Sequence, residues 1–329
     1  MLYELRCPVC RQADAFSDVE RFQQWTIRVC QTCGLQFADP LGTTETYYEE
    51  TRRKSPSLSS LGRLGPDQFR HSARRWAARS RRPEVAIRWL REHVPPGAIV
   101  LDVGCGAGLF LPLIEQAGFV PIGIEISETL VNFLRAKEFR VHLGSVEDYP
   151  AQWPQPQAIM VMEVIEHVPD PVGFLRAIRQ RFPTVPLLLS TPSPRSWAAR
   201  LGVRPAVDWP PNHLLRWSEQ SLRIALQSAG YNSIELSFGP VLSQEIVPTF
   251  SSWLMFRRVL GVVPTARELS SDERSGVRWI YSLLFRFYPT AVWLQERFLP
   301  SVLSVVTVPM ARLLSAKGLS CLSVDVIAR

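Results

Sequence analysis

The chain has 329 residues, of which 46% are hydrophobic, and a formal net charge of +7. This size and composition allow one α/β domain of roughly 200 residues with smaller attachments, and no low-complexity tract interrupts the material for a buried core. Residues 1–11 hold polar residues and two cysteines where a secretory signal would have an apolar stretch, so we expect a cytoplasmic protein.

The first unit of the chain, residues 1–42, is defined by its cysteines. Cys7, Cys10, Cys30 and Cys33 form two C-x2-C pairs that nineteen residues separate, the spacing that closes a tetrahedral thiolate site around Zn²⁺. A disulfide framework is not expected, because intracellular thiol buffers keep cysteines reduced. We therefore predict a structural zinc knuckle, in which metal binding supplies much of the folding free energy.

Residues 43–94 connect this unit to the main domain. A Ser-, Pro- and Gly-rich run over 43–66 indicates a connector, and the apolar positions of 67–93 predict lead-in helices interrupted at Pro83. Between Arg52 and Arg91 the chain has twelve Lys or Arg against two Asp or Glu. This charge can bind nucleic acid, anionic lipid or a phosphorylated substrate, or it can simply form a solvated helix face.

The main domain, residues 95–240 and 320–329, alternates short apolar runs with amphipathic stretches. This pattern is typical of a parallel sheet covered by helices, and we interpret the C-terminal run as its returning seventh strand. The expected strands are 99–103, 120–125, 140–143, 158–162, 186–190, 233–238 and 321–328, and the expected helices are 109–117, 127–137, 171–181 and 218–229.

Residues 241–319 predict a helical insertion before the last strand, because they are apolar, aromatic and without strand alternation. Their longest run of low charge, 298–310, is too short to span a bilayer and contains Pro300 and Pro309. The aromatic stripe can instead lie on the inner surface of a membrane, as a peripheral contact. Alternatively it packs on the main domain or on a second copy in a homodimer, as helical apolar stripes usually do.

A glycine-rich loop follows the first strand of the main domain, where residues 99–110 read IVLDVGCGAGLF. Gly104, Gly106 and Gly108 let the backbone turn sharply and approach a ligand closely. A dinucleotide-binding loop would have G-x-G-x-x-G, but Leu109 occupies the third glycine position. We therefore expect a ligand that has no pyrophosphate to bind.

Two carboxylates accompany the loop. Asp102 directly precedes it, and Glu125 ends the next predicted strand about twenty residues further on, where its two oxygens can accept both hydroxyls of a ribose. A loop and an acid at this spacing between predicted strands indicate a nucleoside-binding site. A generic nucleotide-binding sheet with another cofactor is the alternative.

Several stretches together resemble the class I S-adenosylmethionine-dependent methyltransferase superfamily, more narrowly a bacterial branch similar to ubiquinone-pathway O-methyltransferases. They are VLDVGCGAGLF, GIEIS, GSVEDYP, MEVIEHVPDP and PPNHLLRWSEQSLRIALQSAGY. The resemblance covers residues 95–240 and the last strand, and it implies a Rossmann-like seven-stranded methyltransferase sheet. The cysteine unit followed by GLQFADP resembles the zinc-binding N-terminus of sugar and cell-surface-glycan methyltransferases.

The resemblance also implies which residues bind S-adenosylmethionine. Asp102 and the backbone of residues 104–108 would hold its methionine end, Glu125 its ribose, and Ser145 with Val146 its adenine. The family more often has Asp where Ser145 stands, so adenine recognition is expected to rest on backbone contacts here. The complete expected set is Asp102, Gly104, Cys105, Gly106, Gly108, Glu125, Ser145, Val146 and Glu163.

Candidate catalytic groups follow the strand predicted at 158–162. A hydroxyl acceptor must lose a proton, which requires a base or a metal ion. By analogy with some related methyltransferases, Glu163, Glu166 and His167 would bind Mg²⁺. In a second interpretation Glu163 contacts the cofactor, Glu166 begins a helix, and His167 or His213 is the base. In a third, both histidines only brace loops.

Three functions are compatible with these features. The first is methylation of a hydroxyl of a sugar or of another small or glycan-linked acceptor in polysaccharide or natural-product synthesis, with the zinc unit beside the acceptor or in a subunit contact. The second is RNA base methylation, which the basic segment favours but the lack of an interleaved aromatic platform disfavours. The third is a non-catalytic binding protein on the same fold, which the intact loop and acid disfavour.

Overall fold

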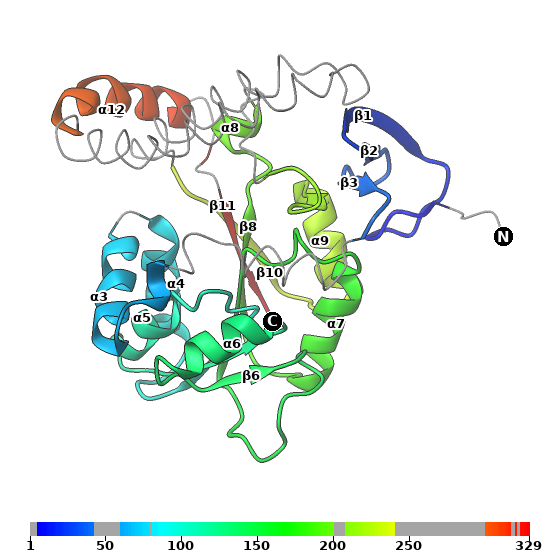
Figure 1. The fold of residues 1–329 in the computed structure, drawn as a ribbon. Coiled ribbons are helices and arrows are strands. Elements are labelled where there is room, and N and C mark those ends of the chain that lie inside the picture. Colours follow the sequence, from blue (N-terminus) through cyan, green and yellow to red (C-terminus); the bar gives the residue numbers. More distant parts are fainter. Residues whose placement is uncertain are drawn as a thin grey trace, which may run out of the picture.

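The computed structural model describes residues 5–42, 60–78, 80–200, 208–240, 300–316, 320 and 323–329. Figure 1 shows a central sheet between two groups of helices, with a small N-terminal unit of strands at one side. Residues 43–59 of the predicted connector (43–66) and residues 241–299 and 317–319 of the predicted insertion lie outside the described residues.

The central sheet has seven strands in the order β10-β11-β8-β7-β4-β5-β6. Neighbouring strands from β8 to β6 are parallel, and β11 is antiparallel to both β8 and β10. The prediction of a seventh strand that returns into the same sheet is therefore confirmed. The strands are β4 (Ile99–Val103), β5 (Val120–Glu125), β6 (Val141–Leu143), β7 (Ala158–Met162), β8 (Leu187–Pro192), β10 (Ile234–Phe238) and β11 (Ser323–Ala328).

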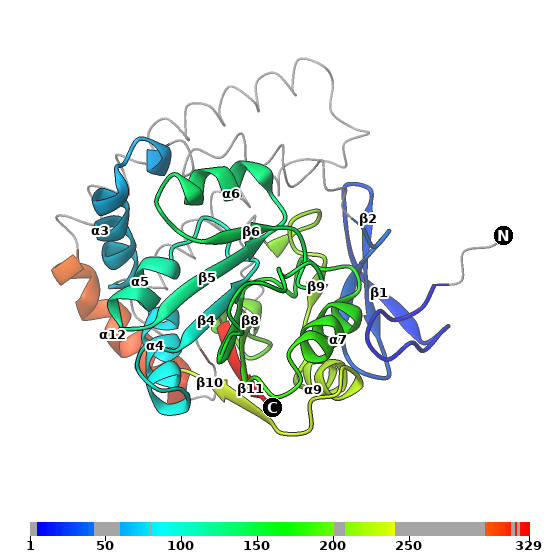
Figure 2. The same ribbon diagram turned by 90° about the horizontal axis from the view of Figure 1, so that it is seen from below.

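Helices cover both faces of this sheet, as Figure 2 shows from below. One layer consists of α3 (Pro66–Ala77), α4 (Arg81–His93), α5 (Leu111–Gln116) and α6 (Glu128–Arg135). The other face carries α7 (Pro171–Arg181) and α9 (Glu219–Ser228), whose apolar residues pack on the sheet and on each other. Two further helices, α8 (Trp197–Arg200) and α12 (Pro300–Ala316), lie outside these two layers.

Alternate residues of the inner strands supply the two halves of the core. In β4, Val100 packs with α4 and α5, whereas Leu101 and Val103 belong to the cluster that includes α7 and α9. Successive side chains of a strand point to opposite faces, and burial of both faces requires a continuous apolar run. For this reason β4 and β7 are predictable from the sequence, and both have the predicted bounds.

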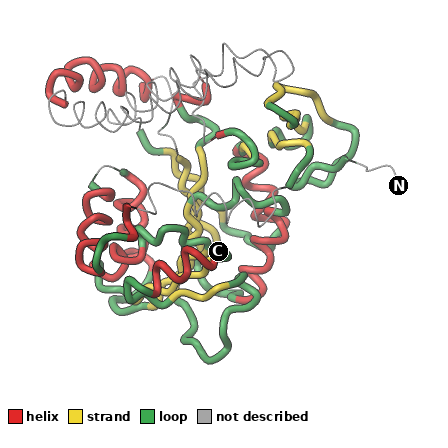
Figure 3. Tube along the Cα trace, viewed as in Figure 1, coloured by secondary structure: helices red, strands yellow, loops and turns green. Residues whose placement is uncertain are grey.

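The N-terminal unit is a second, antiparallel sheet, drawn as strands and loops in Figure 3. Its strands are β1 (Phe16–Phe22), β2 (Trp25–Cys30) and β3 (Gln36–Asp39), and a fourth, β9 (Leu215–Arg216), comes from the main domain. The register pairs Gln36 with Arg216 and Phe37 with Leu215. The cysteine unit therefore shares a sheet and a hydrophobic core with the second half of the chain.

The prediction that Pro83 interrupts the lead-in helices is wrong. Pro83 lies in the first turn of α4, which begins after its N-cap Ser80, whereas α3 already ends at its C-cap Ala78. Proline is tolerated in a first helical turn because the amide groups there have no intrahelical acceptor. Among the described residues, no helix is long and apolar enough to cross a membrane.

Candidate functional site

A cavity of about 330 Å³ opens at the carboxyl ends of the parallel strands, where open α/β sheets bind ligands. The glycine loop, the end of β5 and the segment after β7 meet there. Its lining residues are Val103, Gly104, Gly106, Ile124, Glu125, Ile126, Ser127, Gly144, Ser145, Val146, Glu147, Glu163, Val164, His167, Val168, Pro169 and Phe174.

The three loop glycines all have left-handed backbone conformations, with φ angles of 71°, 56° and 70°, which side chains rarely adopt. A Cβ atom at Gly104 would also stand 2.8 Å from a methyl carbon of Val164, and one at Gly108 would stand 2.3 Å from Leu134. Gly104 and Gly106 line the cavity, whereas Gly108 allows the loop to pack on α6.

Glu125 ties the loop to the end of β5. Its Oε2 accepts a hydrogen bond from the amide of Gly106 at 2.8 Å, and its Oε1 accepts from the amides of Ile126 and Ser127 at 2.9 and 3.0 Å. A carboxylate has about four acceptor positions. Backbone amides occupy three of these positions, so acceptor capacity remains for a ligand hydroxyl, and the role of Glu125 at a ribose stays a prediction.

Ser145 and Val146 line the other side of the cavity. The carboxylate of Asp148 accepts hydrogen bonds from the hydroxyl and the amide of Ser145, at 2.8 and 3.1 Å. These bonds lower the pKa of Asp148, the backbone bond most. Ile126, which was not among the predicted site residues, is an apolar lining residue that is 58% exposed and immediately follows Glu125. An apolar residue just after a strand-end acid was the available signal.

Two predicted cofactor residues, Asp102 and Cys105, do not line the cavity. Asp102 is buried, and burial, assisted by the charge of Glu125, raises its pKa to about 7. Burial likewise raises the pKa of Cys105 well above its usual value. The Cys105 sulfur covers Gly123, where a Cβ atom would lie 2.8 Å from it.

Glu163 lines the cavity from the end of β7 with a left-handed φ of 58°. This conformation is uncommon for a residue with a side chain and is frequent at ligand sites. Its Oε1 accepts a hydrogen bond from the hydroxyl of Ser190 at 2.9 Å, and its Oε2 lies 3.3 Å from the guanidinium of Arg82. The basic lead-in segment thus reaches the site through α4.

Glu166, His167 and His213 form one cluster, in which a ligating atom of each lies within 4.8 Å of the others. Glu163, which the sequence analysis grouped with Glu166 and His167, is not part of it. Glu166 is fully buried, and this burial, with the charge of Glu163, raises its pKa to about 8. Its Oε2 accepts from the hydroxyl of Thr191 at 3.0 Å, while its Oε1 has no hydrogen-bond partner among the described residues.

Of the two histidines, His167 lines the cavity and His213 lies behind it, with ring centroids 4.8 Å apart. Nδ1 of His167 is hydrogen-bonded to the backbone carbonyl of Asn212. A carbonyl only accepts, so Nδ1 carries the proton and the neutral ring has its lone pair on Nε2. His213 is 3.3 Å from Asp208. Burial lowers the pKa of His213, but the hydrogen bond to Asp208 and the charge of Glu166 outweigh burial, so the pKa is raised.

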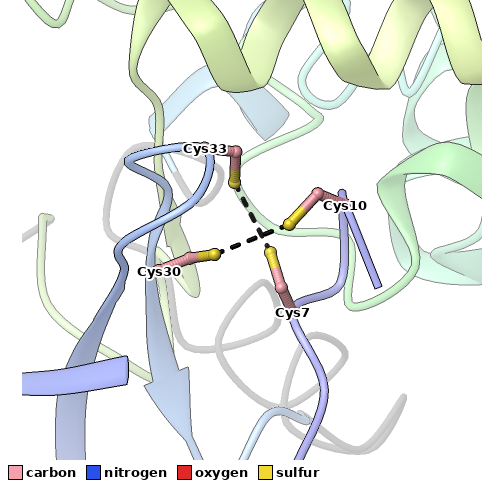
Figure 4. A group of neighbouring side chains, drawn as sticks. All are labelled: Cys7, Cys10, Cys30 and Cys33. Atoms are coloured by element: carbon pink, nitrogen blue, oxygen red, sulfur yellow. Dashed lines mark hydrogen bonds between the residues drawn. The ribbon is translucent and has the colours of Figure 1, made fainter. Parts of the chain in front are cut away.

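The four predicted zinc ligands converge on one point, as Figure 4 shows. The sulfur atoms of Cys7 and Cys33 are 3.6 Å apart, and those of Cys10 and Cys30 are 3.5 Å apart. A tetrahedron with Zn–S bonds of about 2.3 Å has sulfur atoms about 3.8 Å apart. The cluster therefore has the size and donor set of a four-cysteine zinc site.

The topology and cavity define the class: an α/β protein of the methyltransferase type with a nucleoside site at the strand ends. Residues 73–236 match the family model described as "Methyltransferase domain". The chain belongs to the class I S-adenosylmethionine-dependent methyltransferase superfamily.

Similar proteins include the ubiquinone biosynthesis O-methyltransferase of Xanthomonas campestris pv. campestris, 36% identical over 128 residues, which are 34% of this chain and 53% of that protein. The enzyme of the same name from Thiobacillus denitrificans is 35% identical over 101 residues, covering 28% of this chain and 44% of that one. The chain thus spans about half the length of the curated relatives it matches. A solved S-adenosylmethionine-dependent methyltransferase from Archaeoglobus fulgidus has a TM-score of 0.42 and 18% identity, covering 75% of this chain and 93% of that one.

Proposed function

We propose that the protein transfers a methyl group from S-adenosylmethionine to a hydroxyl of a sugar or of another small or glycan-linked acceptor. The observation that carries the proposal is a single cavity that is lined both by nucleoside-binding groups and by a candidate base. The glycine loop and Glu125 line it with groups suited to a nucleoside, and Glu163 and His167 line it with groups suited to an acceptor. The ubiquinone biosynthesis O-methyltransferases among its relatives support a hydroxyl as acceptor, and the cysteine unit supports a glycan-type substrate by its resemblance to sugar methyltransferases.

S-adenosylmethionine supplies an activated methyl group on its sulfonium, and transfer to oxygen is an in-line displacement that requires alignment and exclusion of water. Glu125 would accept one ribose hydroxyl, and Ile126 and Val146 would provide apolar contacts to the adenine. His167, with its lone pair on Nε2, would take the proton of the acceptor hydroxyl. The carbonyl of Asn212 holds the ring in that tautomer.

A second candidate mechanism places a divalent cation at Glu166, His167 and His213. The buried Oε1 of Glu166 favours it. This atom makes no hydrogen bond among the described residues and lies 4.0 Å from Nε2 of His167, and such an atom costs free energy unless a cation or a proton satisfies it. Two imidazoles and one carboxylate suit a transition metal better than Mg²⁺, which prefers oxygen ligands. The Mg²⁺ set with Glu163 has less support, since that carboxylate contacts Ser190 and Arg82.

The cysteine unit is proposed to hold structural Zn²⁺, and the protein is proposed to act in the cytoplasm. The sulfur–sulfur distances support the metal, and the burial of Cys7, Cys30 and Cys33 supports a structural rather than a catalytic role.

The test is uptake of labelled methyl from S-adenosylmethionine by nucleotide sugars, lipid-linked glycans, phenols and RNA. We expect transfer to a hydroxyl acceptor of the first two groups, with a fall of about 100- to 10,000-fold in the His167→Ala variant. The turnover of the His213→Ala variant should fall less, because His213 does not line the cavity. Transfer only to RNA, or unchanged turnover in His167→Ala, would contradict the proposal. Loss of turnover on chelation, with the zinc of the cysteine unit retained, would favour the cation.

A further inference from the structure

Residues 208–218, here called the acceptor loop, fix the groups after β7 from behind. The carbonyl of Asn212 accepts a hydrogen bond from Nδ1–H of His167. The amides of Leu214 and Leu215 both donate to the backbone carbonyl of Glu166, at 2.9 and 3.0 Å. The hydrogen bond to Asn212 favours the tautomer with the proton on Nδ1, so a displacement of this loop that broke it would remove that preference.

The cysteine unit holds the acceptor loop from its other side by strand pairing. The amide of Ala38 donates to the carbonyl of Leu214 at 2.9 Å, and Phe37 is paired with Leu215. The carbonyl of Leu214 thus accepts a hydrogen bond from β3, while the amides of Leu214 and Leu215 donate to the carbonyl of Glu166. Phe37 and both leucines are buried, so this pairing is enclosed in a common core.

The β1–β2 hairpin makes a second connection through its tip. Glu20 forms an ion pair and hydrogen bond with Arg216, whose Nη2 also donates to the carbonyl of Asp208 at 3.1 Å. The Glu20 and Arg216 side chains are only 29% and 15% exposed, so solvent screens this pair less than a surface pair. Phe22 packs against Trp209 with ring centroids 4.7 Å apart and ring planes tilted by 31°.

The third connection starts at the metal-binding turn itself. The hydroxyl of Ser218, the N-cap of α9, donates to the carbonyl of Cys33 at 2.6 Å. The amide side chain of Gln220 donates to the carbonyl of Thr32 at 3.2 Å. Both acceptors belong to the turn that carries two of the four thiolates. A metal bound by those thiolates would fix the geometry of this turn and, through Ser218, the end of the acceptor loop.

We infer that the N-terminal cysteine unit is a brace of the catalytic centre, and that Glu20 and Phe22 are positioning residues for His167. This inference rests on the proposed function, because it gives His167 a role. Neither residue lines the cavity. Their contacts act through the acceptor loop, so a weakened brace leaves the nucleoside-binding groups around Glu125 intact.

The test compares Glu20→Gln and Phe22→Ala with Arg21→Gln, a control on the same hairpin whose side chain is 80% exposed. Amide hydrogen exchange is measured at Leu214 and Leu215. We expect the exchange rate to rise about five- to tenfold in Glu20→Gln and Phe22→Ala and to stay unchanged in the control. The ¹⁵N signals of His167 should change from one tautomer to a mixture, whereas a residue that merely stabilised the fold would leave this signature unmoved.

Zinc content and S-adenosylmethionine affinity are measured on the same samples and should stay within about twofold of the original protein. A tenfold change in affinity would require a change of about 1.4 kcal/mol in binding free energy, and the brace variants alter no residue that lines the cavity. Chelation of the zinc should reproduce the exchange and tautomer changes. Unchanged exchange in both brace variants, or acceleration spread equally over β4 and β7, would overturn the inference. Absence of S-adenosylmethionine binding in the unaltered protein would refute the proposed function alone, because the exchange data judge the brace independently.

Discussion

Replacement of Glu125 by Gln tests the nucleoside-binding groups of the cavity. The carboxylate accepts three backbone amide bonds at 2.8 to 3.0 Å. The amide side chain of Gln has one acceptor oxygen, so its NH₂ group would face a donor, the N–H of Gly106. Hydrogen bonds to charged groups contribute about 1.5 to 3 kcal/mol each, and a buried donor left without an acceptor costs a similar amount.

We therefore expect the free energy of unfolding to fall by about 2 kcal/mol. The Kd for S-adenosylmethionine should rise about 10- to 100-fold, because the ribose loses a charged acceptor. Calorimetric titration measures the Kd, and denaturant unfolding measures the stability. The matched control is Glu128→Gln, an exposed acid in the first turn of α6, which should change the Kd by less than about twofold. A Kd of the Glu125→Gln variant that also lies within about twofold of the original value would refute the assignment of Glu125 to the nucleoside site.

Three further predictions concern the metal, the loop and the buried acid of β11. Cys30→Ser should reduce bound zinc from about one ion per chain and lower the melting temperature, as elemental analysis and thermal unfolding would show. Gly108→Ala should cost about 2 to 4 kcal/mol, since its Cβ meets buried Leu134, whereas Gly118→Ala, also left-handed but in open space, should cost about 1 kcal/mol in the same denaturation assay. Burial raises the pKa of Asp325 from 3.8 to about 6, so its contribution to stability is complete below pH 4 and is lost as the pH rises through 6. Asp325→Asn should remove about 3 kcal/mol of that pH dependence between pH 4 and 7, and an unaltered slope would contradict it.

The sequence predicted the elements whose signal is local. β4, β5 and β7 have the predicted bounds because each is a short apolar run between turn residues. The convergence of the four cysteines was predictable because each C-x2-C pair places two thiolates on one tight turn. Pro83 misled the helix prediction because the same residue type breaks a helix interior and begins a helix.

Features set by distant partners were not predicted. β9 is two residues long, and only its pairing with β3 makes it a strand. Nothing near Glu125 in the sequence shows that backbone amides occupy most of its acceptor positions. The order of the two histidines, with His167 in the cavity and His213 behind it, likewise depends on the acceptor loop.

Binding of S-adenosylmethionine and its demethylated product to the zinc-loaded, folded protein is the most direct test of the central claim. The account predicts that both bind with one molecule per chain, and that Glu125→Gln weakens both. Folded protein that shows no heat of binding with either nucleoside, in titrations at high micromolar concentration, would contradict the claim that this cavity is a methyl-donor site.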